Sequence, residues 1–333
     1  MADRSLQYVT LDVFTSTKLQ GNPVAVVLLT GDVELPESKK LQITREFNIS
    51  ETVFLHPAVH GQPPRIQIFT LSGELNFAGH PTIGAAHYLF QKELLTGPLP
   101  SPSPPSLTLG DDNSLDIDTK AGPVRVQFHP AENTVSADIP FNLHVHSGCV
   151  RKDALLATQP RIAGGGDNNP DTDLSKGMRS DYPLVSIVRG VTFALVDLSE
   201  DLMAAVAAGA SPAVELDRDW APSFISTMYY RRMVMRGQEE TEEGTVERLH
   251  VRTIAIGFED PACGSGACAL AAYLALQRGG KGKKYRYQID QGMEIGRRSR
   301  IVVDVVLDRE GTGVAKVIMT GEATVVMEGR LRY

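Results

Sequence analysis

The chain has 333 residues, of which 42% are hydrophobic and 22% charged, and its formal net charge is −7. This length fits two domains of average size, and no apolar run approaches the ~18 residues that a membrane helix needs. The missing apolar run argues against a membrane protein. Because an acidic chain creates no field that attracts nucleic acid, we also expect no nucleic-acid partner.

The N-terminal segment MADRSLQYVTLDVF carries an acidic residue and a strand-like pattern, where a secretory signal would have a basic start and an apolar core. The cysteines are Cys149, Cys263 and Cys268, an odd number without the paired spacing of a metal site. Such usage suits a reducing compartment. We therefore expect a cytoplasmic protein with no metal.

Short β-rich segments follow one another along the chain, and several alternate apolar and polar residues with period two. They lie at residues 8–14, 23–29, 51–55, 65–70, 115–119, 124–129, 135–140, 193–198, 248–253, 300–307, 314–319 and 323–329. The pattern predicts largely antiparallel sheets. Residues 97–106 and 164–177 are rich in Pro, Gly and Asp and predict surface loops, and the basic stretch 278–288 is interpreted mainly as a solvated loop.

An internal repeat relates the two halves of the chain. The strings QGNPVAVVLL, FNISETVFL, RIQIFT and FAGHPTIGAAHYLF are followed, in the same order, by RGVTFALVDL, SFISTMYY, RLHVRT and PACGSGACALAAYLA. The last pair aligns Gly79 with Gly264 and His80 with Ser265. The repeat predicts two domains related by an approximate twofold axis, each with a small-residue helix packed closely on a sheet. Chance matching of small residues is the alternative.

The two helices start with different residue types. Ser265 is a suitable N-cap, and Gly279 with Gly280 forms a suitable stop. In the first copy His80 takes the N-cap place, and Pro81 suits the first turn. Backbone N–H groups and the positive end of the helix dipole favour an anion at such starts. If the two starts face each other across a cleft, a small carboxylate would lie between them.

Five strings together resemble the PhzF, or phenazine biosynthesis-like, family of the diaminopimelate-epimerase-like superfamily: GNPVAVVL, SETVFL, ELNFAGHPTIGAAH, EDPACGSGACALAAYL and QGMEIGRRSRI. The resemblance spans almost the whole chain. It implies an α+β fold of two pseudo-symmetric domains, each a mostly antiparallel β-sheet rolled around a central α-helix. We place the N-terminal lobe at residues 1–125, completed by a C-terminal strand near 315–333, and the C-terminal lobe at 126–314.

The resemblance also implies the chemistry: isomerisation by proton transfer, without a cofactor, in a cleft between the domains and often in a homodimer. The family's acid/base glutamate, its histidine and its aspartate match Glu51, His80 and Asp260, and its substrate-contacting glycine and serine match Gly79 and Ser265. We therefore expect a cofactor-independent isomerase or epimerase acting on a small carboxylate-bearing metabolite. The N–H groups around Gly79, Gly264 and Ser265 would bind the substrate's carboxylate.

Glu51 suits this chemistry because one carboxyl can take a proton and return it elsewhere, each step being worth ~10²–10⁴ in rate. The second copy has Thr227, or no counterpart, at its place, so the repeat is broken where a unique function would break it. Burial beside Val53 and Phe54 would raise its pKa. A surface glutamate capped by Ser50 is the alternative.

His80 and Asp260 have simpler explanations too, as a structural histidine and as a dipole partner of a helix start.

Related epimerases and racemases use two cysteines, one ahead of each helix, but Ala78 stands opposite Cys263, which excludes a two-cysteine racemase. Cys263 is either a second acid/base with the lowered pKa of a helix N-terminus or a small buried hydrophobe. Cys268 should face the core.

Two other functions remain compatible with these residues. Proton abstraction could begin an elimination or ring closure, or the protein could bind a metabolite or partner without turnover. Incorporation of solvent deuterium into a carboxylate ligand separates the enzymes from the binding protein.

Overall fold

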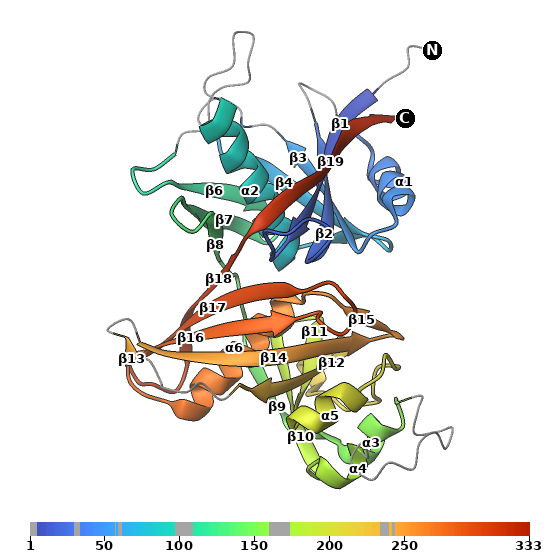
Figure 1. Ribbon diagram of the computed structural model, residues 1–333, viewed down its shortest axis with the longest axis vertical. Helices are drawn as coiled ribbons and strands as arrows, with labels where there is room; N and C mark the ends of the chain where they lie inside the picture. The colour runs from blue at the N-terminus through green and yellow to red at the C-terminus, as the bar shows by residue number, and fades with distance from the viewer. Residues whose placement is uncertain are drawn as a thin grey trace. The chain divides into compact units, whose positions relative to one another are not determined.

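The computed structural model describes residues 5–29, 34–56, 58, 62–96, 109–159, 174–233, 240–241 and 244–333. The chain divides into two compact units, Met1–Pro140 with Ile318–Tyr333, and Phe141–Val317 (Figure 1). The boundary expected at residue 125 falls inside a strand, Gly122–His129, that belongs to the first unit together with the strand after it. Among the described residues, no helix combines the length and apolarity needed to cross a bilayer.

The first unit is built mainly from strands. Its elements are β1 (Ser5–Val13), β2 (Asn22–Leu28), α1 (Glu37–Phe47), β3 (Glu51–His56), β4 (Arg65–Thr70), β5 (Glu74–Leu75), α2 (Gly79–Thr96), β6 (Ser114–Thr119), β7 (Gly122–His129), β8 (Thr134–Asp138) and β19 (Ala323–Arg332). The end of β18 (Val314–Gly321) also pairs with β8.

The second unit is also built mainly from strands. Its elements are β9 (His144–Arg151), α3 (Lys152–Leu156), α4 (Leu174–Gly177), β10 (Asp181–Val188), β11 (Val191–Asp197), α5 (Glu200–Ala205), the 3₁₀ turn η2 (Arg218–Trp220), β12 (Phe224–Arg232), β13 (Glu240–Thr241), β14 (Gly244–Ala255), β15 (Phe258–Asp260), α6 (Gly264–Arg278), β16 (Lys284–Gln291), β17 (Ser299–Leu307) and the start of β18.

The order of strand pairing is repeated in the two units. In the first, β1 pairs antiparallel with β2, β2 runs parallel to β3, β3 and β4 are antiparallel, and the β4–β5 hairpin leads into α2. In the second, β10, β11, β12, β14, β15 and α6 repeat these relationships. A parallel pair then follows in each, β4 with β6 and β14 with β16. The predicted repeat and the mainly antiparallel sheets are therefore confirmed.

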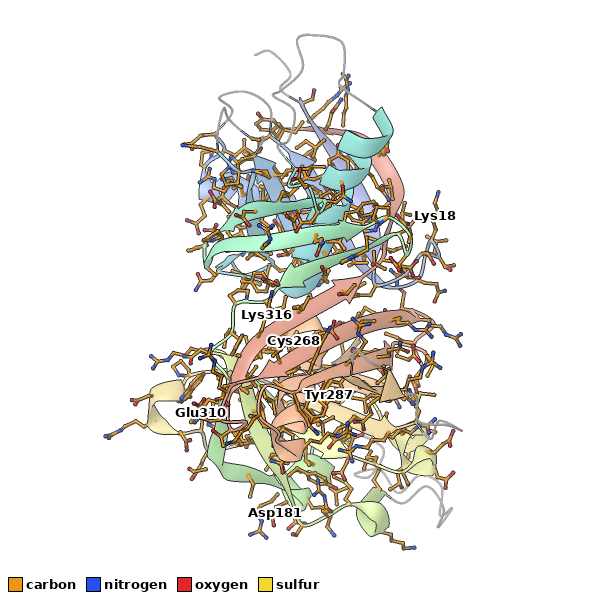
Figure 2. The ribbon with its side chains drawn as sticks, turned by 90° about the vertical axis from the view of Figure 1, so that its left-hand side faces the viewer. Lys18, Asp181, Cys268, Tyr287, Glu310 and Lys316 are labelled. Carbon is orange, nitrogen blue, oxygen red and sulfur yellow. The ribbon has the colours of Figure 1, made fainter. Side chains whose placement is uncertain are left out.

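Each unit wraps its sheet around one helix. In the first unit α2 contacts β1, β2, β3, β4, β7, β8 and β19, and in the second α6 contacts β10, β11, β16 and β17. Small residues permit this close approach: a Cβ on Gly84 would lie 2.8 Å from Val24 Cγ1 and 3.0 Å from Val13 Cγ2. Cys268 of α6 is fully buried, as expected, and lies with Tyr287 inside the second unit (Figure 2).

The three expected loops have different outcomes. Residues 97–106 and 164–173 lie outside the described residues, whereas Leu174–Gly177, at the end of the second predicted loop, forms α4. The basic stretch at 278–288 is corrected: from Lys284 it forms β16, whose alternate residues, beginning with Tyr285, are buried. The lysines and arginines concealed this period-two pattern, because their side chains occupy its outward positions.

Candidate functional site

Glu51 is the first residue of β3 and faces the interior of the first unit. Phe54 packs on the opposite face of the sheet with Ile43 of α1. Because side chains alternate along a strand, Glu51 points instead to the face covered by α2. There its Oε2 lies 3.5 Å from Nε2 of His80, and the two side chains are 18% and 7% exposed. The structure therefore brings together two of the predicted site residues.

The setting of Glu51 favours its neutral form. Burial raises the pKa of this carboxyl, and a hydrogen bond from Ser50 opposes the rise to a lesser degree. Its Oε2 is buried without a hydrogen-bond partner in the described part of the chain. A carboxyl whose pKa is raised toward neutrality is better suited to both accept and return a proton. The proximity of Ser50 was expected, but a solvent-exposed glutamate is not what the structure shows.

Helix α2 begins at Gly79, so His80 is its second residue and not its N-cap. The first backbone bond of the helix runs from Thr82 N–H to the carbonyl of Ala78 at 3.4 Å. Ala78 therefore occupies the N-cap position, and the expectation for His80 was wrong. The buried His80 side chain is instead directed to Glu51, while Pro81 sits in the first turn, where no intrahelical N–H is needed.

In the second unit, Asp260 ends β15 and is followed closely by α6. The N–H of Ala262 donates to Asp260 Oδ1 at 2.9 Å, which ties the carboxylate to its own turn. The helix begins at Gly264 with Cys263 at the N-cap, so the prediction of Ser265 as N-cap was also wrong. Asp260, Gly264 and Ser265 thus lie on one short segment. The predicted stop at Gly279 is confirmed, with a φ of +64°.

Of the two alternatives for Cys263, the structure does not favour a thiol with a lowered pKa. Burial, and next the nearby Asp260 carboxylate, raise the pKa of this thiol, and a contact with Ser265 opposes the rise. Its Sγ lies 3.6 Å from Ser265 Oγ. The raised pKa keeps the thiol protonated at neutral pH.

The strand registers locate the break in the repeat. Thr52 pairs with Ala25 and Thr227 with Ala194, so these two threonines are equivalent and Glu51 corresponds to Ser226. The earlier match of Glu51 to Thr227 was one residue out of register. Ser226 Oγ donates to the carbonyl of Ile254 at 3.0 Å and has no carboxyl.

The first unit likewise has no carboxyl at the position equivalent to Asp260. It pairs with Thr253 in the second hairpin, where the first hairpin pairs Leu75 with Ile68. Each unit therefore carries one carboxyl at a position where the other unit has none.

Gln291, at the end of β16, was not singled out from the sequence. Its side chain is fully buried and contacts the segment that carries Asp260. The available signal was a polar residue at a buried position of an alternating strand, but the part of that strand up to residue 288 had been interpreted as a loop.

One group of possible metal ligands occurs within the described residues: His144, His146 and Asp217 of the second unit. His144 Nε2 lies 2.6 Å from Asp217 Oδ2. His146 is engaged through both ring nitrogens, with Ser186 Oγ at 2.9 Å and the N–H of Asp217 at 3.2 Å. These contacts connect β9 with the segment around η2. None of the predicted site residues belongs to this group.

The chain is similar to known proteins over nearly its whole length. The family model described as phenazine biosynthesis-like protein, PhzC-PhzF, matches residues 11–329. A trans-2,3-dihydro-3-hydroxyanthranilate isomerase of Pseudomonas aeruginosa is 30% identical over 338 residues, covering 97% of this chain and 98% of its own. An uncharacterized isomerase of Mesorhizobium japonicum is 29% identical over 334 residues, with 97% and 98% covered.

A solved structure shares the fold. The crystal structure of a Bacillus anthracis phenazine biosynthesis protein of the PhzF family superposes with a TM-score of 0.69 at 20% identity, covering 98% of this chain and 99% of that chain. This confirms the expected α+β architecture of sheets around central helices. With the family model matching nearly the whole chain, the protein belongs to the phenazine biosynthesis-like family and is an isomerase of the PhzF type.

Proposed function

We propose that this isomerase works without a cofactor, moving a proton between two positions of a small carboxylate-bearing metabolite. Glu51 is the shuttle: its carboxylate takes the proton from carbon, and the resulting acid returns it at another atom. The observation that carries this proposal is the buried Glu51 carboxyl, 3.5 Å from His80, with a raised pKa.

The other predicted residues bind and orient the substrate. His80 and Asp260 contact its amino or hydroxyl groups, and the first N–H groups of α2 and α6, around Gly79, Gly264 and Ser265, receive its carboxylate. Electropositive helix starts would also stabilise an enolate as it forms. The raised pKa of Cys263 supports a packing role for this thiol and argues against a second base.

The Pseudomonas aeruginosa relative supplies a suitable first substrate, since trans-2,3-dihydro-3-hydroxyanthranilate carries a carboxylate, an amino group and a hydroxyl. The test is its isomerisation in D₂O, followed by NMR. We expect deuterium in the product in proportion to turnover. Stoichiometric binding of this compound with no deuterium exchange would favour the binding protein, and loss of water or ring closure would favour the elimination enzyme.

A further inference from the structure

The side-chain amide of Gln291 spans the short segment between β15 and α6. Its Nε2 donates to the carbonyl oxygen of Asp260 at 2.7 Å, and its Oε1 accepts from the N–H of Cys263 at 3.3 Å. One buried side chain thus holds both ends of the turn that bears the Asp260 carboxylate and leads into the first amides of α6. An amide suits this place because it donates and accepts at once without charge.

The residue after Gln291 packs against the same segment. Gly292 has a φ of +75°, and a Cβ there would lie 2.7 Å from the carbonyl oxygen of Pro261 and 2.3 Å from that of Arg297. Only glycine permits this approach of backbone to backbone. The end of β16 therefore supports the turn by backbone contact as well as by the Gln291 amide.

The first unit supports its corresponding turn differently. Its β4–β6 pairing sets Arg65 opposite Asp118, as β14–β16 sets His250 opposite Asp290, so Thr119 stands at the place of Gln291. Thr119 Oγ1 instead bonds to the carbonyl of Gly122 at 2.7 Å. The side-chain clamp therefore belongs to the unit that carries Asp260 and is not a general requirement of the repeated fold.

We propose that Gln291 is a positioning residue that fixes the Asp260 carboxylate relative to the first amides of α6. It acts through the turn and does not touch the substrate. The proposal rests on the proposed function for the role of Asp260, but the geometry it asserts can be measured without any substrate. The reporters are the Ala262 N–H, which binds Asp260 Oδ1 and not Gln291, and the Cys263 thiol.

The test compares Gln291→Met and Gln291→Glu with Gln288→Met in the full chain, in a Cys149→Ser background that removes the exposed thiol. Gln288 is a matched control because it lies on β16 and accepts one hydrogen bond, from Arg248 Nε at 2.9 Å. Amide exchange is followed by NMR, and Cys263 is alkylated with iodoacetamide across pH. The methionine variant removes both the donor to Asp260 and the acceptor for Cys263 N–H, whereas an ionised glutamate keeps the acceptor and replaces the donor with a charged oxygen.

Both Gln291 variants should raise exchange of the Ala262 amide by about tenfold, the effect of losing one buried hydrogen bond, and Gln291→Met should raise the alkylation rate of Cys263 at neutral pH by a similar factor. In Gln291→Met the alkylation profile should move to lower pH, because the thiol becomes less buried and leaves the influence of Asp260. In Gln291→Glu the added carboxylate acts in the opposite direction. The control should match the parent. Unchanged Ala262 exchange and an unchanged alkylation profile in both Gln291 variants would overturn the proposal, whether or not Glu51 proves to carry the proton.

Discussion

His80 Nε2 and Glu51 Oε2 lie 3.5 Å apart, although the two residues come from different elements, the second position of α2 and the first position of β3. The contact exists because β3 directs Glu51 inward and α2 begins beside that strand. It sets an imidazole next to the carboxyl whose pKa burial raises.

The raised pKa of Glu51 makes stability depend on pH. The unfolded chain releases this proton near pH ~4.3, while the folded protein retains it to higher pH. The free energy of unfolding should therefore fall as pH rises from about 4 through the folded pKa, by ~1.4 kcal/mol for each unit of the pKa difference. Glu51→Gln should lack this loss.

Urea unfolding of the parent and Glu51→Gln across pH 3.5–8, a range set by the ~4.3 reference pKa, measures the effect. The stability of the variant relative to the parent should increase with pH over this window. A parent that gains stability relative to the variant as pH rises would show that the pKa of Glu51 is lowered by folding.

His80→Gln should lower kcat/KM by roughly tenfold to a hundredfold, as expected for the loss of a group that positions substrate. His87 of the same helix provides the control. Its ring is fully buried and lies 3.0 Å from the carbonyl of Asn133 through Nε2. His87→Gln should reduce the free energy of unfolding and leave kcat/KM within about twofold of the parent. Equal losses of activity in both variants would assign His80 a structural role.

Cys263→Ala should retain kcat within about twofold, because a thiol with a raised pKa is a poor base at neutral pH. Cys268→Ala, a change at a fully buried position of the same helix, controls for lost packing. Steady-state kinetics of both variants make the comparison. A fall of ~10² or more for Cys263→Ala alone would place the thiol among the acid/base groups.

Gly84→Ala should destabilise the first unit, although alanine is the better helix former. The added methyl would lie 2.8 Å from Val24 Cγ1 and 3.0 Å from Val13 Cγ2, and both valines are buried and stiff at χ1. We expect a net loss of about 1–3 kcal/mol in urea unfolding. A more stable variant would show that α2 can move off its sheet without cost.

Much of the architecture follows from local patterns. Alternation in segments such as residues 65–70 and 300–307 predicted their strands, because the period of two is a property of the strand itself. The repeated order of strings predicted the repeated topology, because similar local sequences form similar strands and helices in the same order. Helix starts were harder: capping preferences indicated Ser265, whereas the chain places Cys263 at the N-cap without any side-chain cap bond.

The site depends on relationships that a sequence does not contain. A register error of one residue replaced Ser226 by Thr227 as the counterpart of Glu51, and on a strand such a slip exchanges the inner face for the outer. The direction of the Cys263 pKa shift required knowing how deeply the thiol is buried and that Asp260 lies close to it. The role of the Gln291 amide required the distance from β16 to a turn 31 residues earlier in the chain, as its contact with Asp260 shows.

The most direct measurement is solvent-deuterium incorporation during turnover by Glu51→Gln, beside the parent and Glu74→Gln. Glu74 is a suitable control because it belongs to the same unit and pairs with Lys120 at 3.2 Å. Glu51→Gln should lose ~10²–10⁴ in exchange rate while its affinity for the substrate changes little, and Glu74→Gln should behave as the parent. Exchange at the parental rate in Glu51→Gln would contradict the assignment of Glu51 as the proton shuttle.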